Sequence, residues 1–158
     1  MGKTGTNVTV GLSDDDAYLA QDSYIGAVCG RYANRIEKSR YRDLNGNEII
    51  LVANEGETHL HGGIDGFDKR LWTISEQSKS SVSFTLSSPD GDQGYPGNLT
   101  TTATYSIIAD NRLRLELTAT CDKTCPVNMT SHAYWSSETR RGGKECRTRV
   151  RAEPLEER

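Results

Sequence analysis

The sequence has few large apolar side chains and no long apolar run. Leu, Ile, Val and Phe together make up 29 of its 158 residues, close to the composition below which a chain no longer folds. The net charge of −3 is too small to unfold the chain by self-repulsion. We therefore interpret it as a globular chain with a small core, as expected for a piece of a larger domain.

Targeting signals and strong charge of one sign are also lacking. No stretch approaches the roughly 20 apolar residues that a membrane-spanning helix needs. Residues 1–12 contain one lysine and no apolar segment, which excludes a signal peptide. Mild acidity gives no electrostatic basis for binding nucleic acid or an anionic membrane. We predict a cytoplasmic protein with neither nucleic acid nor membrane as a partner.

The cysteines and acidic turns form no regular metal-binding pattern. The four cysteines are Cys29, Cys121, Cys125 and Cys146. A zinc site built from Cys121, Cys125 and His132 is an alternative to free, partly buried thiols, which we favour because there is no second cysteine pair. Residues 90–92 resemble the start of a calcium loop, but Thr101 occupies the position that needs a glutamate. The sequence predicts no metal site.

Apolar residues recur with a period of two. The alternating sets are Val82, Phe84 and Leu86; Ala103, Tyr105 and Ile107; and Leu113, Leu115, Leu117 and Ala119. Each set places apolar side chains on one face of a strand. Asp110-Asn111 predicts a hairpin turn between the last two strands, and polar clusters at 45–47 and 88–98 separate further strands. The pattern predicts an all-β fold, an antiparallel β-sandwich.

Two segments depart from this pattern. Ser13 and Asp16 resemble a capping box that opens one or two helical turns around residues 17–19. Residues 138–158 contain 12 charged residues in 21 and almost no apolar ones, so they cannot offset the entropy of ordering. We therefore divide the chain into a domain at 1–136 and a charged, disordered tail at 137–158. The tail is either genuine or translated intron or out-of-frame sequence, and we favour the latter.

One group of candidate functional residues lies in the first half of the chain. His61 precedes Gly62-Gly63, and paired glycines permit close approach of backbone or ligand. Arg35 follows Asn34, and a guanidinium beside an amide can bind adjacent hydroxyl groups or a ring oxygen. His59 is interpreted as a structural or surface histidine.

A second group surrounds His132. If residues 128–135 form a strand, His132 and Tyr134 share one face with Asn128 and Thr130. An imidazole titrates near the working pH, and here it stands among aromatic and hydrogen-bonding side chains. That combination suits binding of a sugar and proton transfer to it.

Four motifs occur in one order along the chain. They are Gly-Arg-Tyr-Ala-Asn-Arg-Ile at 30–36, Leu-His-Gly-Gly with Gly-Phe-Asp-Lys and Trp at 60–72, Ser-Pro-Asp-Gly-Asp-Gln-Gly-Tyr-Pro-Gly at 88–97, and Asn-Met-Thr-Ser-His-Ala-Tyr-Trp at 128–135. This succession resembles the aldose 1-epimerase (galactose mutarotase) family over residues 10–135. The resemblance implies a large antiparallel β-sandwich that interconverts the α and β anomers of hexoses such as glucose and galactose, without metal or organic cofactor.

The resemblance also implies roles for individual residues. His132 corresponds to the general acid that protonates the ring oxygen, while another group takes the proton from the C1 hydroxyl. The residues expected to contact the monosaccharide are Asn34, Arg35, His61, Ala133 and Tyr134. The acid role requires a protonated His132, which a neighbouring carboxylate favours.

The chain departs from the family pattern in the residues that complete the reaction. Family members are about twice as long, and their catalytic base is a glutamate in a C-terminal half that has no matching motif here. The first strands of the family have no match either. We therefore expect a copy truncated at both ends, with weak activity or none. The alternatives are a non-catalytic sugar-binding β module and an inactive gene fragment. The sequence does not indicate an oligomeric state.

Overall fold

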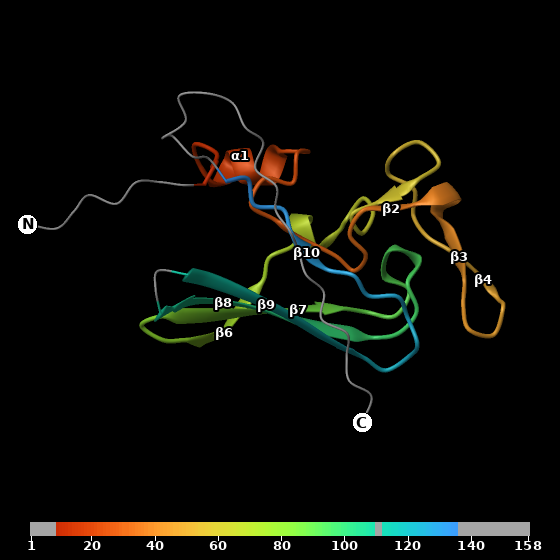
Figure 1. The fold of residues 1–158 in the computed structure, drawn as a ribbon. Helices are drawn as coiled ribbons and strands as arrows, with labels where there is room; N and C mark the ends of the chain where they lie inside the picture. Colours follow the sequence, from red (N-terminus) through yellow and green to blue (C-terminus); the bar gives the residue numbers. More distant parts are fainter. Residues whose placement is uncertain (1–8, 110–111, 136–158) are drawn as a thin grey trace, which may run out of the picture.

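The computed structural model describes residues 9–109 and 112–135 and shows two layers built mainly of strands (Figure 1). One layer is a four-stranded antiparallel sheet in the order β6-β7-β8-β9. Its strands are β6 (Thr73–Gln77), β7 (Ser81–Ser88), β8 (Leu99–Ile108) and β9 (Arg112–Cys121). Three of them contain the sets that alternate in the sequence, so these strand predictions are confirmed. The predicted turn at 110–111 and the predicted tail at 137–158 lie outside the described residues.

The register of the sheet places the apolar residues on one face. Tyr105 pairs with Val82 on β7 and with Leu115 on β9, and directly paired residues point to the same face. On the other face, serine and threonine hydroxyls meet across strands, as between Ser83 Oγ and Thr104 Oγ1 at 2.9 Å. The period-two pattern therefore predicted both the strands and the face that turns toward the second layer.

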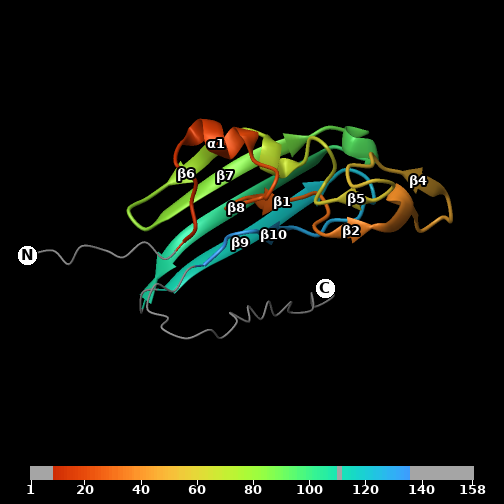
Figure 2. The ribbon, with the colours of Figure 1, turned by 90° about the horizontal axis from the view of Figure 1, so that it is seen from above.

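The second layer consists of short strand pairs and loops that cover one face of the sheet (Figures 1 and 2). The pairs are β1 (Val28–Cys29) with β10 (Thr130–Ser131), β2 (Arg35–Ile36) with β5 (His59–Leu60), and β3 (Arg40–Arg42) with β4 (Glu48–Ile50). The elements that complete this layer, among the described residues, are the 3₁₀ turns Glu37–Ser39, Phe67–Lys69 and Asp92–Gly94 and the helix α1 (Asp15–Ala20). This arrangement confirms the predicted antiparallel sandwich.

The helix starts one residue later than the capping-box pattern predicted. Asp14, not Ser13, is the N-cap, and its carboxylate accepts a hydrogen bond from the backbone N–H of Ala17 at 2.9 Å. Ser13 Oγ instead donates to the Asp14 side chain at 2.7 Å. A carboxylate caps a helix as well as a hydroxyl does and also suits the positive end of the helix dipole. The helix itself was therefore predicted correctly and its cap wrongly.

The apolar core is small, as the composition predicted. Phe67, Leu86 and Leu99 are buried together between the layers. Trp72 packs edge-on against Phe67, with ring centroids 5.9 Å apart, and donates its indole N–H to the Phe67 carbonyl at 3.1 Å. Toward the far end of the sheet, Ile107 and Leu113 remain 64% and 52% exposed, so part of the apolar face is uncovered within the described residues. No helix among these residues is long and apolar enough to cross a membrane.

A buried polar cluster of Arg31, His59, Ser88 and Tyr95 lies beside the apolar core. The Arg31 guanidinium, 2% exposed, donates to Ser88 Oγ and to backbone carbonyls of the 88–97 segment. His59 is fully buried, and its Nδ1–H donates to the Val52 carbonyl at 2.6 Å. Its Nε2 therefore accepts from the Tyr95 hydroxyl at 2.7 Å. Each of these side chains is hydrogen-bonded, so the buried polar cluster stabilises the loops around it.

Candidate functional site

Four rings from three distant segments form the ring cluster: Tyr24, His61, His132 and Tyr134. The His61 and His132 centroids are 5.3 Å apart with nearly perpendicular planes. Tyr24 lies 4.6 Å from His61 and 5.7 Å from His132, and Tyr134 lies 5.2 Å from His132. Both histidines are half-buried. The fold therefore brings together the two histidines that the sequence singled out.

Backbone hydrogen bonds to the 23–29 segment place His132. β10 pairs with β1, and just beyond it the His132 N–H donates to the Ala27 carbonyl at 2.8 Å. The Gly26 N–H donates to the His132 carbonyl at 3.3 Å. The predicted strand at 128–135 is reduced to Thr130–Ser131, but the rings of His132 and Tyr134 still lie on a common side.

A reciprocal pair of hydrogen bonds between Asn34 and His61 fixes the second imidazole. The His61 N–H donates to the Asn34 carbonyl at 3.1 Å, and the Asn34 N–H donates to His61 Nδ1 at 3.0 Å. Residues 61–63 all have positive φ, at 52°, 99° and 94°. A Cβ on Gly62 would overlap the Gly30 carbonyl, so only glycine allows this approach. The paired glycines thus have the role that the sequence suggested.

The hydrogen bond at Nδ1 determines what His61 offers a ligand. Because Nδ1 accepts from a backbone N–H, the proton of the neutral ring lies on Nε2, which is then a donor. Burial, and secondly the neighbouring charge of His132, lower the pKa of His61 below 6.5. The neutral form of His61 is therefore favoured, and its Nε2–H stands as a hydrogen-bond donor beside the His132 ring.

Arg35 lies at the exposed rim of the site and is paired with Glu55. Its Nε and Nη2 donate to the two carboxylate oxygens at 2.5 and 2.7 Å. Hydrogen bonding to Arg35 holds the pKa of Glu55 below its ordinary value. The pair presents a fixed fork with free N–H groups beside the imidazoles. No motif in the sequence indicated Glu55.

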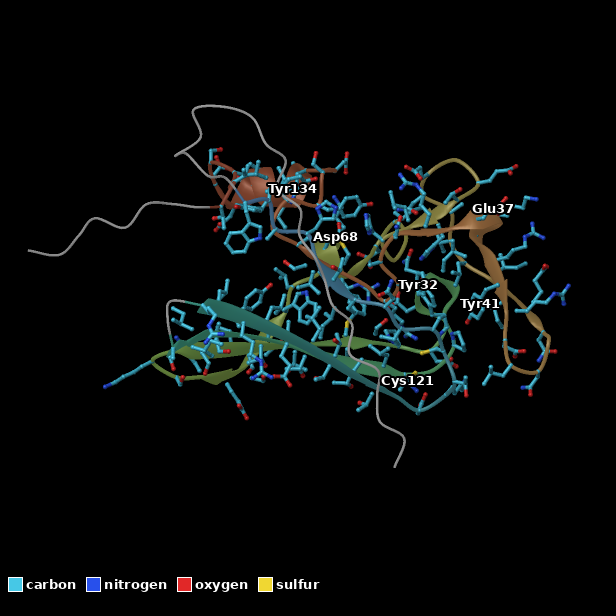
Figure 3. All side chains as sticks on the ribbon, viewed as in Figure 1. Tyr32, Glu37, Tyr41, Asp68, Cys121 and Tyr134 are labelled. Carbon is cyan, nitrogen blue, oxygen red and sulfur yellow. The ribbon has the colours of Figure 1, made fainter. Side chains whose placement is uncertain are left out.

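The remaining predicted site residue, Ala133, lies apart from the ring cluster. It lines an apolar hollow of about 630 Å³ with Leu115, Leu117 and Trp135. Figure 3 shows Tyr134 beside α1, at the opposite end of the upper layer from Tyr41 on the β3–β4 hairpin. The structure thus gathers His61, His132, Tyr134, Asn34 and Arg35, and directs Ala133 toward the sheet.

Two residues of this region were not predicted as site residues: Tyr24, which belongs to the ring cluster, and Asp68, which lies beside it. Tyr24 was missed because no residue pattern around it indicated a site. Asp68 belongs to the Gly-Phe-Asp-Lys motif, and its Oδ1 is buried without a hydrogen-bond partner among the described residues. Burial raises the pKa of Asp68, and burial together with the Asp68 charge raises the pKa of Cys29 to about 12. Cys29 is therefore a protonated, unreactive thiol.

The described residues contain no cluster of three His, Cys, Asp or Glu side chains that could hold a metal. Cys29, Cys121 and Cys125 are free thiols, as predicted, and Cys146 lies outside the described residues. Asp90 and Asp92, which resembled a calcium loop, instead bind cationic side chains. Lys123 Nζ donates to Asp90 at 2.5 Å, and Arg70 donates to Asp92 at 2.6 and 2.7 Å.

Comparisons with known proteins connect this arrangement to a single family. The family model described as Aldose 1-epimerase matches residues 1–156. The aldose 1-epimerase of Escherichia coli K12 is 48% identical over 127 residues, which are 80% of this chain and 36% of that protein. The galactose mutarotase of Homo sapiens is 40% identical over 131 residues, or 83% of this chain and 37% of that protein.

Solved structures agree with the sequence matches. A GalM/aldose epimerase homologue from C. elegans superposes with a TM-score of 0.78 at 32% identity, over 84% of this chain and 41% of that chain. A galactose 1-epimerase from Lactobacillus acidophilus superposes with a TM-score of 0.74 at 30% identity, over 82% and 39%. The chain spans 36% of the length of the Escherichia coli aldose 1-epimerase and 37% of the Homo sapiens galactose mutarotase, a little over a third of each.

Proposed function

Because this chain belongs to the aldose 1-epimerase family, we propose that its ring cluster binds a hexose and takes part in interconverting its α and β anomers. The observation that carries the proposal is the 5.3 Å separation of the His61 and His132 rings. That spacing lets two nitrogen donors reach neighbouring oxygens of one pyranose ring. Glucose and galactose are the proposed substrates, and the cytoplasm is the proposed location.

The two imidazoles divide the work according to their surroundings. His61 is held with its Nε2–H as a donor, which suits binding of a sugar hydroxyl or the ring oxygen. No hydrogen bond within the described residues occupies a His132 ring nitrogen, so that ring is free to deliver a proton to the ring oxygen. Protonation there weakens the C1–O5 bond, and loss of the C1 hydroxyl proton completes ring opening to the aldehyde. Rotation about C1–C2 and closure then give either anomer.

Asn34, Arg35 and Tyr134 are proposed to hold the sugar in place. The Arg35 guanidinium keeps N–H groups available for hydroxyls after binding Glu55. Tyr134, 45% exposed, provides an aromatic surface beside His132. Ala133 is proposed to contribute to the site only through its backbone, which connects His132 and Tyr134 of the ring cluster.

The described residues offer no clear candidate for the group that takes the proton from the C1 hydroxyl. Within the described residues, no carboxylate hydrogen-bonds to the ring of either histidine, and the family's glutamate has no matching motif in the sequence. A positioned proton-transfer group contributes about 10²–10⁴-fold to a rate. We therefore expect this chain to bind the sugar but to accelerate mutarotation only weakly.

Polarimetry and a binding titration test the proposal together. The rotation of freshly dissolved α-D-glucose or α-D-galactose is followed with the full 158-residue chain and with His132→Ala. Any acceleration over buffer should fall to the buffer rate in the variant. Saturable binding should appear as shifts of the imidazole C2 protons and weaken in Arg35→Ala. Acceleration that survives His132→Ala would remove the proposed acid, and absence of binding would remove the site.

A second candidate is a sugar-binding module without catalysis, and it is favoured by the absence, among the described residues, of a carboxylate hydrogen-bonded to either histidine ring. In that case the monosaccharide binds at the ring cluster with equal affinity in the wild type and in an acid-deficient His132→Gln variant. Polarimetry would then show no acceleration by either protein.

A further inference from the structure

The Gly-Phe-Asp-Lys motif at 66–69 has no part in the proposed chemistry, and its contacts lead to a loop at residues 21–27. The Gln21 side chain closes this loop on itself. Its amide nitrogen donates to the Ile25 carbonyl at 3.0 Å, and its amide oxygen accepts from the Ile25 N–H at 2.8 Å. Inside the loop, the Ala27 N–H donates to the Tyr24 carbonyl at 3.1 Å.

Lys69 anchors this loop to the rest of the fold. Its Nζ donates to the Gln21 carbonyl at 2.5 Å and lies 3.3 Å from an Asp22 carboxylate oxygen. Lys69 ends the 3₁₀ turn Phe67–Lys69, whose first N–H donates to the Gly30 carbonyl at 3.2 Å. The motif therefore links the 21–27 loop to Gly30, whose carbonyl also lies against Gly62.

The residue that the 21–27 loop holds in place is Tyr24. Tyr24 has φ of 57°, a conformation that a bulky residue adopts only when its surroundings enforce it. In this conformation its ring contacts both imidazoles, edge-on to His61 at 4.6 Å and tilted to His132 at 5.7 Å. Tyr24 is thus the one ring of the cluster that contacts both histidines.

We propose that Tyr24 is a positioning residue: its ring, held by the 21–27 loop and Lys69, fixes the orientation of the His61 and His132 imidazoles relative to each other. Its importance for a sugar rests on the proposed function, but its effect on the rings does not. A ring wedged against two imidazoles limits their rotation and excludes water from their shared side.

The chemistry of the Tyr24 hydroxyl is consistent with this passive role. Burial, and then the negative charge of Asp68, raise the pKa of Tyr24 above 10. The side chain is therefore neutral at physiological pH and adds no charge to the imidazole pair. Its effect on the histidines comes from shape and exclusion of water, so phenylalanine should replace it.

Nuclear magnetic resonance of the imidazole protons tests this without relying on activity. The nuclear Overhauser effect between the His61 and His132 rings and the pH titration of each C2 proton are measured in the full chain. Tyr24→Ala should weaken the inter-ring effect severalfold and raise the midpoint of His61 toward 6.5, its ordinary value. Tyr24→Phe should leave both unchanged. Lys69→Met, which frees the loop but keeps the Tyr24 ring, should change both in the same direction as Tyr24→Ala, by less.

Tyr41→Ala is the matched control, since Tyr41 is another half-buried tyrosine, on the distant β3–β4 hairpin (Figure 3). Tyr41→Ala should leave the signals of His61 and His132 unchanged. The proposal is overturned if Tyr24→Ala keeps the inter-ring effect and the His61 midpoint, or if Tyr41→Ala changes them equally. A galactose titration of the same samples separates the two proposals. Failure to bind sugar with the ring effects intact would count against the function and leave Tyr24 in place.

Discussion

The buried polar cluster and the ring cluster use the same residue types in opposite ways. His59 and His61 are two residues apart, yet both His59 ring nitrogens are hydrogen-bonded inside the protein, whereas His61 Nε2 has no hydrogen-bond partner in the described part of the chain. Arg31 is 2% exposed and saturated with carbonyl oxygens, whereas the Arg35 side chain is 56% exposed and binds one carboxylate.

This difference separates residues that stabilise from residues that can act. A buried polar group with every partner present contributes to stability and has no capacity left for a ligand. A half-buried group with a free nitrogen contributes less to stability and can bind. A change in the buried polar cluster or at a tightly packed backbone position should therefore cost more stability than a similar change without those contacts.

The largest effect is expected from Arg31→Met. It removes the donors to four backbone carbonyls and to Ser88 Oγ, which should lower the free energy of unfolding by about 3–5 kcal/mol. Arg31→Lys should recover little, because an ammonium lacks the fork that reaches these acceptors. Arg35→Met should leave stability nearly unchanged and weaken sugar binding. Urea denaturation measures the free energy of unfolding of each variant. Equal losses of stability in Arg31→Met and Arg35→Met would contradict the distinction between the buried polar cluster and the ring cluster.

An intermediate effect is expected from Gly62→Ala. The methyl group would overlap the Gly30 carbonyl at a φ of 99°, and strain of this kind costs about 1–3 kcal/mol. Gly46 has a similar φ of 84° in the β3–β4 turn with open space around it. Gly46→Ala therefore measures the cost of backbone conformation alone. Thermal unfolding should rank Gly62→Ala well below Gly46→Ala, and the reverse ranking would contradict the tight contact.

The smallest effect is the pH dependence of stability that His59 confers. Burial lowers the pKa of His59 below 6.5, so near pH 6 the unfolded chain binds more protons than the folded chain. This contribution is present above pH 6.5 and is lost as the pH falls toward the folded-state pKa. His59→Asn should reduce that slope in urea denaturation between pH 8 and pH 5.5. His61→Asn should reduce it less, and a larger reduction there would reverse the comparison.

Local patterns made the regular parts of this molecule predictable. The alternation in residues 82–86, 103–107 and 113–119 determines which face of a strand is apolar, and β7, β8 and β9 follow it. His61 and His132 were recognised because their motifs combine imidazoles with glycines and aromatic residues. Gly62-Gly63 predicted a close backbone approach, which the structure confirms at Gly30.

Contacts that depend on the tertiary fold were not predictable from local patterns. Glu55 and Arg35 are 20 residues apart and lie in no shared motif. Tyr24 joins the ring cluster only because its loop is closed by Gln21 and held by Lys69. The helix cap is Asp14 and not the predicted Ser13, because adjacent polar residues compete for the same backbone N–H groups. In each case the sequence offers several partners, and packing selects one.

The pairing of β1 with β10 has a consequence for when the site forms. Asn128 donates its side-chain amide to the Ala33 carbonyl across 95 residues, and His132 follows directly on this connection. Closing so long a loop is entropically unfavourable and tends to occur late in folding. The ring cluster should accordingly assemble after the β7–β8 and β8–β9 hairpins. On a ribosome, both histidines can meet only once residue 132 has left the exit tunnel.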